Sequence, residues 1–541
     1  MQLSESKQQK ITTLRALNET EKLSLIFTQQ RQMSEVQARL QAFQCAHQMG
    51  TCPLCQDKDL AIVQLQQQIE HLKQKIFGRS SERRKKKRTK QKLKDDSEEN
   101  ITSSRRTRLP SEQFPNARIQ ESLLEDATPP KCDQCAQSMT DSGMRETAER
   151  IEYQPAELYI QRTNRVRYHC KCCQVAPKTA ALPERLAPGT SLGDSLLIQA
   201  SISKFYDLIP TTRFAKILAR THAAVSHNLL LKAQSLMAFV LLPVYRLIKQ
   251  EIVSSRVVHA DETIHRQLED NNGHWRWYLW GFSNRNSIYF EIHDTRASAV
   301  SIGFMLDSQA LFLVSDAYTG YERTIREVNE LRQQKNIHLL QSCLCNDHSR
   351  RYFFYAHGEL AEKALDVYEQ IYKIEGKVQK ILKEPLYQEP ENSQKALEIR
   401  QTADPLFNQI YDISCEILMD SPEKSLEATA AKYFLNHVKG LTLFLRHIEL
   451  PISNALAERG IRDSVLLRKT ALGNHSKAGA EEAAVQLSVM GSCKMAGVNP
   501  SEFLEFIRTK YLAKEPLLTP YQYKLHKELL RKSKPPDALL E

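Results

Sequence analysis

Short apolar runs between residues 256 and 345 follow the pattern expected of β-strands. They read RVVHAD, HWRWYLWGFS, SIYFEIHD, LFLVSDAY and IHLLQSCLC, and they are rich in β-branched and aromatic residues. Helical patterns near 296–306 and 319–334 separate the later runs. The predicted order is three strands, a helix, a strand, a helix and a strand, which fits a mixed sheet flanked by helices.

Helical patterns dominate on both sides of this segment, near 193–250 and 350–450. The stretch TTRFAKILARTHAAVSHNLLLKAQ offers Thr212 as an N-cap and a short break near Thr221. It predicts either a helix-turn-helix or two ordinary packed helices. Near the end, AGVNPSEFLEFI predicts a helix that Asn499 caps and that has Pro500 at its first position.

An amphipathic segment near the N-terminus repeats its apolar residues at alternating intervals of three and four. The repeating residues are Ile62, Leu65, Ile69, Leu72 and Ile76. This spacing is the seam of a coiled coil, and its polar flanks favour self-association. Because the seam is short, a single amphipathic helix packed on its own chain is the alternative.

Length and composition fit a soluble chain of several domains. The 541 residues suggest roughly three to five structural units, and 41% hydrophobic with 26% charged residues is ordinary for globular proteins. The longest apolar run, 236–245, contains Pro243 and is shorter than the roughly 20 residues of a membrane helix. The N-terminus lacks the apolar core of a secretory signal, so we expect a cytoplasmic protein without membrane contact.

The formal charge of +11 favours polyanion partners, and its distribution is uneven. Ten basic residues fall between Arg79 and Lys94, where Glu82 is the only acid. Residues 79–112 also lack apolar periodicity, which predicts a flexible tether that meets DNA phosphates or a solvated linker. The candidate phosphate contacts at its centre are Arg84, Lys85, Lys86, Lys87 and Arg88.

Cysteine spacing predicts a structural zinc site, since disulfides are rare in the cytoplasm. Cys132, Cys135, Cys170 and Cys173 form two C-x2-C pairs, and each pair can direct two thiolates at one ion. The metal would stabilise a unit too small for a core of its own.

A second cysteine cluster lies nearer the N-terminus. Cys45, His47, Cys52 and Cys55 could form another zinc site or remain free thiols in a loop.

Two acids close predicted strands and are candidate magnesium ligands. Asp261 is the last residue of RVVHAD, and Asp316 follows the apolar run of LFLVSDAY. The element order is that of a ribonuclease H-like core, in which the first and fourth strands are neighbours, so these carboxylates would lie side by side. Oxygen ligands of this kind suit Mg²⁺, and two-metal sites catalyse phosphoryl transfer. Glu458 in SNALAERGIR is the candidate third acid, although strand-end aspartates also serve purely structural roles.

Cationic side chains near these acids are candidate phosphate ligands. Arg459 and Arg462 follow Glu458 on the same helical segment, while His348, Arg350 and Arg351 follow the last predicted strand. The alternative for the latter three is pairing with surface acids or local packing.

Other conspicuous side chains are expected to be structural. Trp275 and Trp277 should share one strand face and Trp280 the other, which favours sheet packing over a stacking platform for bases. Cys343 and Cys345 should be buried strand thiols.

Six motifs in chain order resemble the insertion sequence 66 family of DDE transposases. They are LKQKIFGRSSE (72–82), YDLIPTTRFAKILAR (206–220), HADET (259–263), SDAYTGYE (315–322), CNDHSRRYF (345–353) and NALAERGIRDSVLLRK (454–469). The resemblance covers nearly the whole chain, and the paired cysteines fall where the family has its zinc finger.

The resemblance implies a DDE transposase that cuts and joins DNA. Asp261, Asp316 and Glu458 would be its catalytic triad, holding two Mg²⁺ or Mn²⁺ ions, with Asn454 matching the family's Asn before the Glu. Implied partners are DNA (element ends and target), a second copy of the chain and small accessory proteins of the same element, in the bacterial cytoplasm and on the nucleoid when bound. The alternative is a non-catalytic, zinc-containing DNA-binding protein derived from an inactivated transposase.

These patterns together predict a multidomain α/β protein. The expected segments are N-terminal leucine-zipper-like helices (1–78), a basic flexible linker (79–112), a zinc-binding unit (113–180), a helical, helix-turn-helix-like segment (181–250), the first part of a ribonuclease H-like catalytic core (251–349), a helical insertion (350–450), the third acid with C-terminal helices (451–510) and a tail (511–541).

Overall fold

The computed structural model describes residues 110–113, 158–168, 178–220, 225–268, 275–383 and 390–532. Arg83–Arg162 forms one compact unit, of which α4 (Pro110–Gln113) and residues 158–162 are described. The other unit comprises Met1–Glu82 and Thr163–Glu541. Four predictions lie outside the described residues: the coiled coil at 62–76, the basic segment 79–94, the paired C-x2-C motifs and the cysteine cluster at 45–55.

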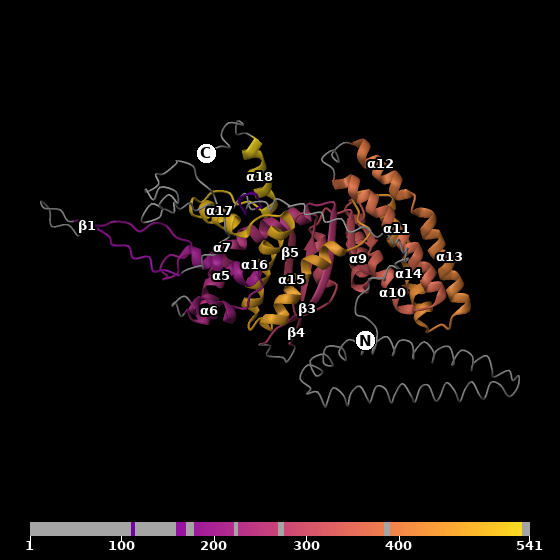
Figure 1. Ribbon diagram of the computed structural model, residues 1–541, viewed down its shortest axis with the longest axis horizontal. Coiled ribbons are helices and arrows are strands. Elements are labelled where there is room, and N and C mark those ends of the chain that lie inside the picture. Colours follow the sequence, from indigo (N-terminus) through magenta and orange to yellow (C-terminus); the bar gives the residue numbers. More distant parts are fainter. Residues whose placement is uncertain are drawn as a thin grey trace, which may run out of the picture. The chain divides into compact units, whose positions relative to one another are not determined.

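A five-stranded mixed sheet lies between two groups of helices in the larger unit (Figure 1). The strands are β3 (Val257–Arg266), β4 (Arg276–Ser283), β5 (Ile288–His293), β6 (Phe312–Ser315) and β7 (Gln341–Leu344). They lie in the order β5-β4-β3-β6-β7; β3–β4 and β4–β5 pair antiparallel, while β3–β6 and β6–β7 pair parallel. The predicted mixed sheet flanked by helices is confirmed, and this order is compatible with a ribonuclease H-like core.

Helices cover both faces of the sheet because residues along β4 alternate in direction. Phe282 stacks on Phe304 of α8, with ring centroids 3.9 Å apart. The neighbouring Gly281 faces the other way, where a Cβ atom would lie 3.1 Å from Ile461 of α15. The covering helices are α8 (Ala299–Leu306) and α9 (Thr319–Gln334) on one face, and α15 (Ala455–Ala471) and α16 (Lys477–Ala496) on the other.

A helical insertion separates β7 from α15. Its aromatic core contains Phe353, Tyr368, Phe407, Phe434 and Phe444, all fully buried. The insertion consists of α10 (Asn346–Ala356), α11 (Glu359–Lys383), α12 (Pro390–Gln401), α13 (Asp404–Asp420), α14 (Leu426–Thr442) and the 3-10 helix η2 (Leu443–Leu445).

A buried arginine ties this insertion to the segment that leads into α15. The guanidinium of Arg400 makes a bidentate pair with Glu375, at 2.9 and 2.7 Å. It also donates to the backbone carbonyls of Phe444, His447, Ile448 and Leu450. Because both charges are paired and hydrogen-bonded, the ion pair can be accommodated in the interior.

Further helices complete the unit on the side of the sheet away from the insertion (Figure 1). They are α5 (Asp194–Phe205), α6 (Thr211–Ala219), α7 (His227–Val253), α17 (Pro500–Leu512) and α18 (Pro520–Lys532), and the short strands β1 (Arg167–Tyr168) and β2 (Lys178–Thr179) precede them. Asn499 caps α17 as predicted, accepting bonds from the amides of Ser501 and Glu502.

The prediction of Thr212 as a helix N-cap is wrong. Helix α6 begins at Thr211, and Pro210 precedes it in an extended conformation. The carbonyl of Pro210 accepts the first bonds, from the amides of Arg213 and Phe214. Proline sets the entry of the chain here, so a side-chain cap is not required.

The apolar run at 236–245 lies within α7 and is a core helix, as predicted. Met237, Val240, Leu241 and Val244 are fully or almost fully buried. Within the described ranges of the chain, no helix combines the length and apolarity needed to cross a bilayer.

The turn between α15 and α16 fastens the end of α15 to β3. The amide of Asn474 donates to the carbonyl of Arg266 at 3.0 Å, and the amide of Leu268 donates to Asn474 at 2.8 Å. Gly473 makes this approach possible with φ at +120°, and a Cβ atom there would lie 2.3 Å from the Arg266 carbonyl oxygen.

We predict that Gly473→Ala destabilises the protein by about 1–3 kcal/mol, because the new Cβ collides with backbone at a φ that side chains rarely adopt. Chemical denaturation of the purified variant measures this loss. Gly376→Ala is the matched control, since Gly376 lies in α11 with no atom within 4 Å of its Cβ position. It should be neutral or stabilising by about 0.5–1 kcal/mol, and equal stability of the two variants would contradict the role given to this turn.

Candidate active site

The strand-end acids Asp261 and Asp316 lie on neighbouring parallel strands. His259 of β3 is opposite Val314 of β6. Continuing this register by two residues places Asp261 opposite Asp316, one position beyond the end of β6. The sheet therefore brings the two carboxylates together at one edge.

Backbone amides hold both aspartates in place. Oδ1 of Asp261 accepts a bond of 2.9 Å from the amide of Glu262. Oδ1 of Asp316 accepts a bond of 3.1 Å from the amide of Tyr318. Short side chains anchored in this way have little freedom to move apart.

Glu458 reaches the same place from the first turn of α15. The positive end of the helix dipole favours a carboxylate at this position. Its Oε1 lies 3.9 Å from Sγ of Cys345 and 3.8 Å from Nδ1 of His348. The third acid thus has a sulfur and an imidazole as neighbours in addition to the two aspartates.

The electrostatics of Asp261 show that the acids form one cluster. Burial, together with the charges of Glu262, Asp316 and Glu458, raises the pKa of Asp261 to about 8. Opposed carboxylates of this kind favour either a proton or a bound cation. The donors of the three acids are all oxygens, which is the ligand set that Mg²⁺ prefers.

Asn454 positions Glu458 against β3 and is itself fully buried. Its Nδ2 donates to the carbonyl of Ala260 at 2.9 Å, and its Oδ1 lies 3.0 Å from Nδ1 of His259. Its backbone amide donates to Sγ of Cys345 at 3.2 Å, and its carbonyl accepts the amide of Glu458. Burial lowers the pKa of His259 to about 4, so the neutral ring donates through Nδ1.

Glu262 points to the opposite face of β3, where its buried carboxylate binds the partly exposed Arg296 and the buried Tyr321. Its Oε1 accepts bonds from Arg296, and its Oε2 accepts one from the hydroxyl of Tyr321 in α9. Its side chain is only 3% exposed. Sequence reasoning missed these contacts, because the only local signal is the strand alternation that turns Glu262 away from Asp261.

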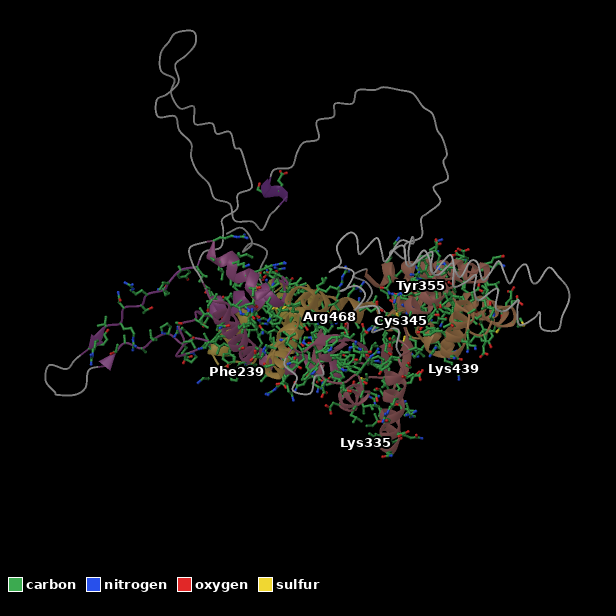
Figure 2. All side chains as sticks on the ribbon, turned by 90° about the horizontal axis from the view of Figure 1, so that it is seen from below. Phe239, Lys335, Cys345, Tyr355, Lys439 and Arg468 are labelled. Carbon is green, nitrogen blue, oxygen red and sulfur yellow. The ribbon has the colours of Figure 1, made fainter. Side chains whose placement is uncertain are left out.

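Cys345, labelled in Figure 2, lies at the junction of β7 and α10, and its place beside Glu458 was also missed. Both Cys343 and Cys345 are buried, as predicted, and burial raises the pKa of each to about 12. The sequence predicted that both thiols are buried, but not which side chains each sulfur contacts.

The predicted phosphate-binding cations lie on two helices. His348, Arg350 and Arg351 are half-buried residues of α10. Arg459 and Arg462 are exposed on α15, directly after Glu458. Arg84, Lys85, Lys86, Lys87 and Arg88 belong to the segment outside the described residues.

The tryptophans divide between core and surface. Trp280 is fully buried and donates to the carbonyl of Thr295 at 3.2 Å, which confirms its packing role. Trp275 is 47% exposed, with the guanidinium groups of Arg266 and Arg276 at 5.5 and 5.4 Å from its ring. Packing alone therefore accounts for Trp280 but not for Trp275.

Comparison with known proteins agrees with the resemblance. A sequence model of the Transposase IS66 family matches residues 189–482, more than half of the chain and a segment that includes all three acids. Uncharacterized protein y4jD of Sinorhizobium fredii (strain NBRC 101917 / NGR234) is 26% identical over 372 residues, which cover 66% of this chain and 70% of the relative. Uncharacterized protein y4hP of the same strain is 22% identical over 424 residues, covering 73% and 72%. With its sheet order, its acidic cluster and this match, the chain belongs to the Transposase IS66 family.

Proposed function

We propose that this protein cleaves and joins DNA strands during transposition, using a metal centre formed by Asp261, Asp316 and Glu458. The observation that carries this proposal is the convergence of Asp316 and Glu458 on Asp261, whose pKa is raised to about 8 by burial and by the charges of Glu262, Asp316 and Glu458. Such a cluster is unfavourable without a counter-charge, and family membership supports a role in transposition.

The oxygen-only donor set of the three acids fits Mg²⁺ or Mn²⁺. Two ions bound there would activate the attacking oxygen and stabilise the leaving oxygen in an in-line displacement. Asp261 and Asp316 supply ligands held by backbone amides, and Glu458 supplies one from a helix.

The reaction consists of two phosphoryl transfers. Hydrolysis of a phosphodiester at the element end frees a 3′-hydroxyl, which then attacks a phosphodiester of the target DNA. Arg459 and Arg462, exposed beside Glu458, would neutralise phosphates near the reacting bond. Arg350, Arg351 and His348 of α10 would contact the same DNA.

The remaining segments would hold and pair the DNA ends. The basic segment 79–94 would add affinity that does not depend on base sequence. The N-terminal heptads would join two copies of the chain, and Zn²⁺ would organise the paired C-x2-C unit.

We predict that Asp261→Asn, Asp316→Asn and Glu458→Gln each reduce Mg²⁺-dependent nicking of DNA carrying the element's own ends by at least about 100-fold. Metal activation and charge stabilisation supply several kcal/mol of barrier reduction, and about 1.4 kcal/mol is a factor of ten. Conversion of supercoiled to nicked plasmid measures the rate. Binding to the same ends, measured by fluorescence anisotropy, should stay the same or tighten.

The matched control for this experiment is Asp294→Asn. Asp294 also follows a strand of the same sheet, β5, but it is exposed and lies outside the acidic cluster. It should nick like the wild type. Wild-type activity of Asp261→Asn would overturn the catalytic assignment, and a wild type that binds its ends but never nicks, with accessory proteins present, would favour the non-catalytic alternative.

We predict that Asp261→Asn raises the melting temperature of the metal-free protein more at pH 8 than at pH 5. The pKa of Asp261 is raised from 3.8 in the unfolded chain to about 8 in the folded protein. As pH rises from about 4 to 8, the unfolded chain therefore loses this proton while the folded protein retains it, and the free energy of unfolding falls over this pH range. In a unit of this size each kcal/mol removed from this penalty is worth about 1 °C, because the entropy of unfolding grows by about 2.1 cal/mol/K per residue. Mg²⁺ should stabilise the wild type more than the variant, and an identical pH dependence of the two metal-free proteins would contradict the acidic cluster.

We predict that one zinc per chain remains after dialysis against a weak chelator and is lost in Cys132→Ser and Cys170→Ser. Four thiolates hold zinc far more tightly than an open site with fewer ligands. Elemental analysis of the dialysed protein measures the content. Retention of stoichiometric zinc by the double variant Cys132→Ser/Cys135→Ser would refute this site.

A further inference from the structure

We propose that Cys345, His348 and Glu458 form a second cation site, which takes Zn²⁺ and thereby withdraws Glu458 from the magnesium centre. The three donor atoms all lie within 4.8 Å of one another. A thiolate, an imidazole and a carboxylate are the ligands of zinc rather than of magnesium. Three protein ligands leave one position open, which is typical of an exchangeable ion rather than a closed structural site.

The backbone places the two new ligands on one turn. Cys345 is the N-cap of α10 and His348 lies three residues later, so their side chains share one side of the first helical turn. Glu458 lies in the first turn of α15. Two helix N-termini therefore meet at the cluster, and both favour anionic ligands.

The observed distances are close to those of a metal site. Zinc bonds at tetrahedral angles put ligand atoms about 3.4–3.6 Å apart. Glu458 Oε1 lies 3.9 Å from the sulfur and 3.8 Å from the imidazole nitrogen, a few tenths of an ångström more than a zinc site has. The sulfur and the nitrogen lie within 4.8 Å of each other, so this third pair would approach by at most about 1.4 Å.

The hydrogen bonds at the cluster leave a place for a cation. The Cys345 thiol donates toward Glu458, so a cation can take the place of that proton between sulfur and oxygen. Sγ already accepts the amide of Asn454 at 3.2 Å, a contact that holds the sulfur in place beside Glu458. Nδ1 of His348 is buried and has no hydrogen-bond partner within the described part of the chain, so its lone pair is available.

Cobalt provides a direct test, because Co²⁺ substitutes for Zn²⁺ and gives a thiolate charge-transfer band. The full-length protein, with its own zinc in place, is titrated with Co²⁺ as wild type, Cys345→Ser and Cys343→Ser. Cys343 is the matched control, since it is equally buried in β7 but its sulfur faces the carbonyl of Pro451. Cobalt exchange at other cysteines is common to all three proteins and cancels in the difference.

We expect the wild type and Cys343→Ser to bind one more Co²⁺ per chain, with its charge-transfer band, than Cys345→Ser. His348→Gln should weaken Co²⁺ binding by at least about tenfold while keeping the charge-transfer band of the Cys345 thiolate. Nδ1 of His348 has no hydrogen-bond partner in the described part of the chain, so the substitution removes no bond at that atom. Equal stoichiometry and spectra in wild type and Cys345→Ser, or unchanged affinity in His348→Gln, would overturn the site.

The expected inhibition of DNA nicking by Zn²⁺ rests on the proposed function of Glu458, whereas the binding of the metal at Cys345 does not. Zn²⁺ at a concentration that fills the site should reduce Mg²⁺-dependent nicking by at least about tenfold in the wild type and Cys343→Ser, as loss of a metal ligand predicts. The same Zn²⁺ should change nicking by Cys345→Ser far less. If no protein nicks in Mg²⁺ alone, the proposed function fails while the cobalt result still decides the site. If zinc binds at Cys345 and wild-type nicking is unaffected, the competition for Glu458 is wrong.

Discussion

The fixed position of α15 on β3 is the constraint on which the candidate site depends. Asn454 joins the start of α15 to Ala260 and His259, immediately before Asp261, and also to Cys345 at the end of β7. At the other end of α15, Asn474 bonds to the end of β3. With both ends fastened, Glu458 has a defined place over the sheet although the whole helical insertion separates it from Asp316 in the sequence.

This arrangement holds groups together that repel one another. The raised pKa of Asp261 means that the fold opposes ionisation of this one carboxyl group, and the free energy that offsets it must come from packing elsewhere. The aromatic stacking of Phe282 on Phe304 is a contact of that kind. Local instability relieved by a ligand is a common property of sites that bind ions.

Much of the sheet could be predicted from the sequence, because strand alternation and apolar runs are local signals. The order of strands and helices follows from these runs, and the neighbourhood of Asp261 and Asp316 then follows from the topology. What could not be predicted depends on contacts between distant segments. Neither the pairing of Glu262 with Arg296 nor the contact of Cys345 with Glu458 leaves a periodicity in the chain.

The three acids differ in freedom of movement, and this difference bears on which ion the proposed site would select. Asp261 and Asp316 are short and each is fixed by a backbone amide, so they present oxygens in one direction. Glu458 has a longer side chain that is 33% exposed, and it stands between these oxygens and the Cys345–His348 pair. In the function proposed above, the aspartates would offer a hard ligand set and the Cys345–His348 pair a softer one, so the direction of the Glu458 carboxylate would decide which set is completed. Because Asn454 fixes the backbone but not the side chain of Glu458, the ions present would then decide between the two.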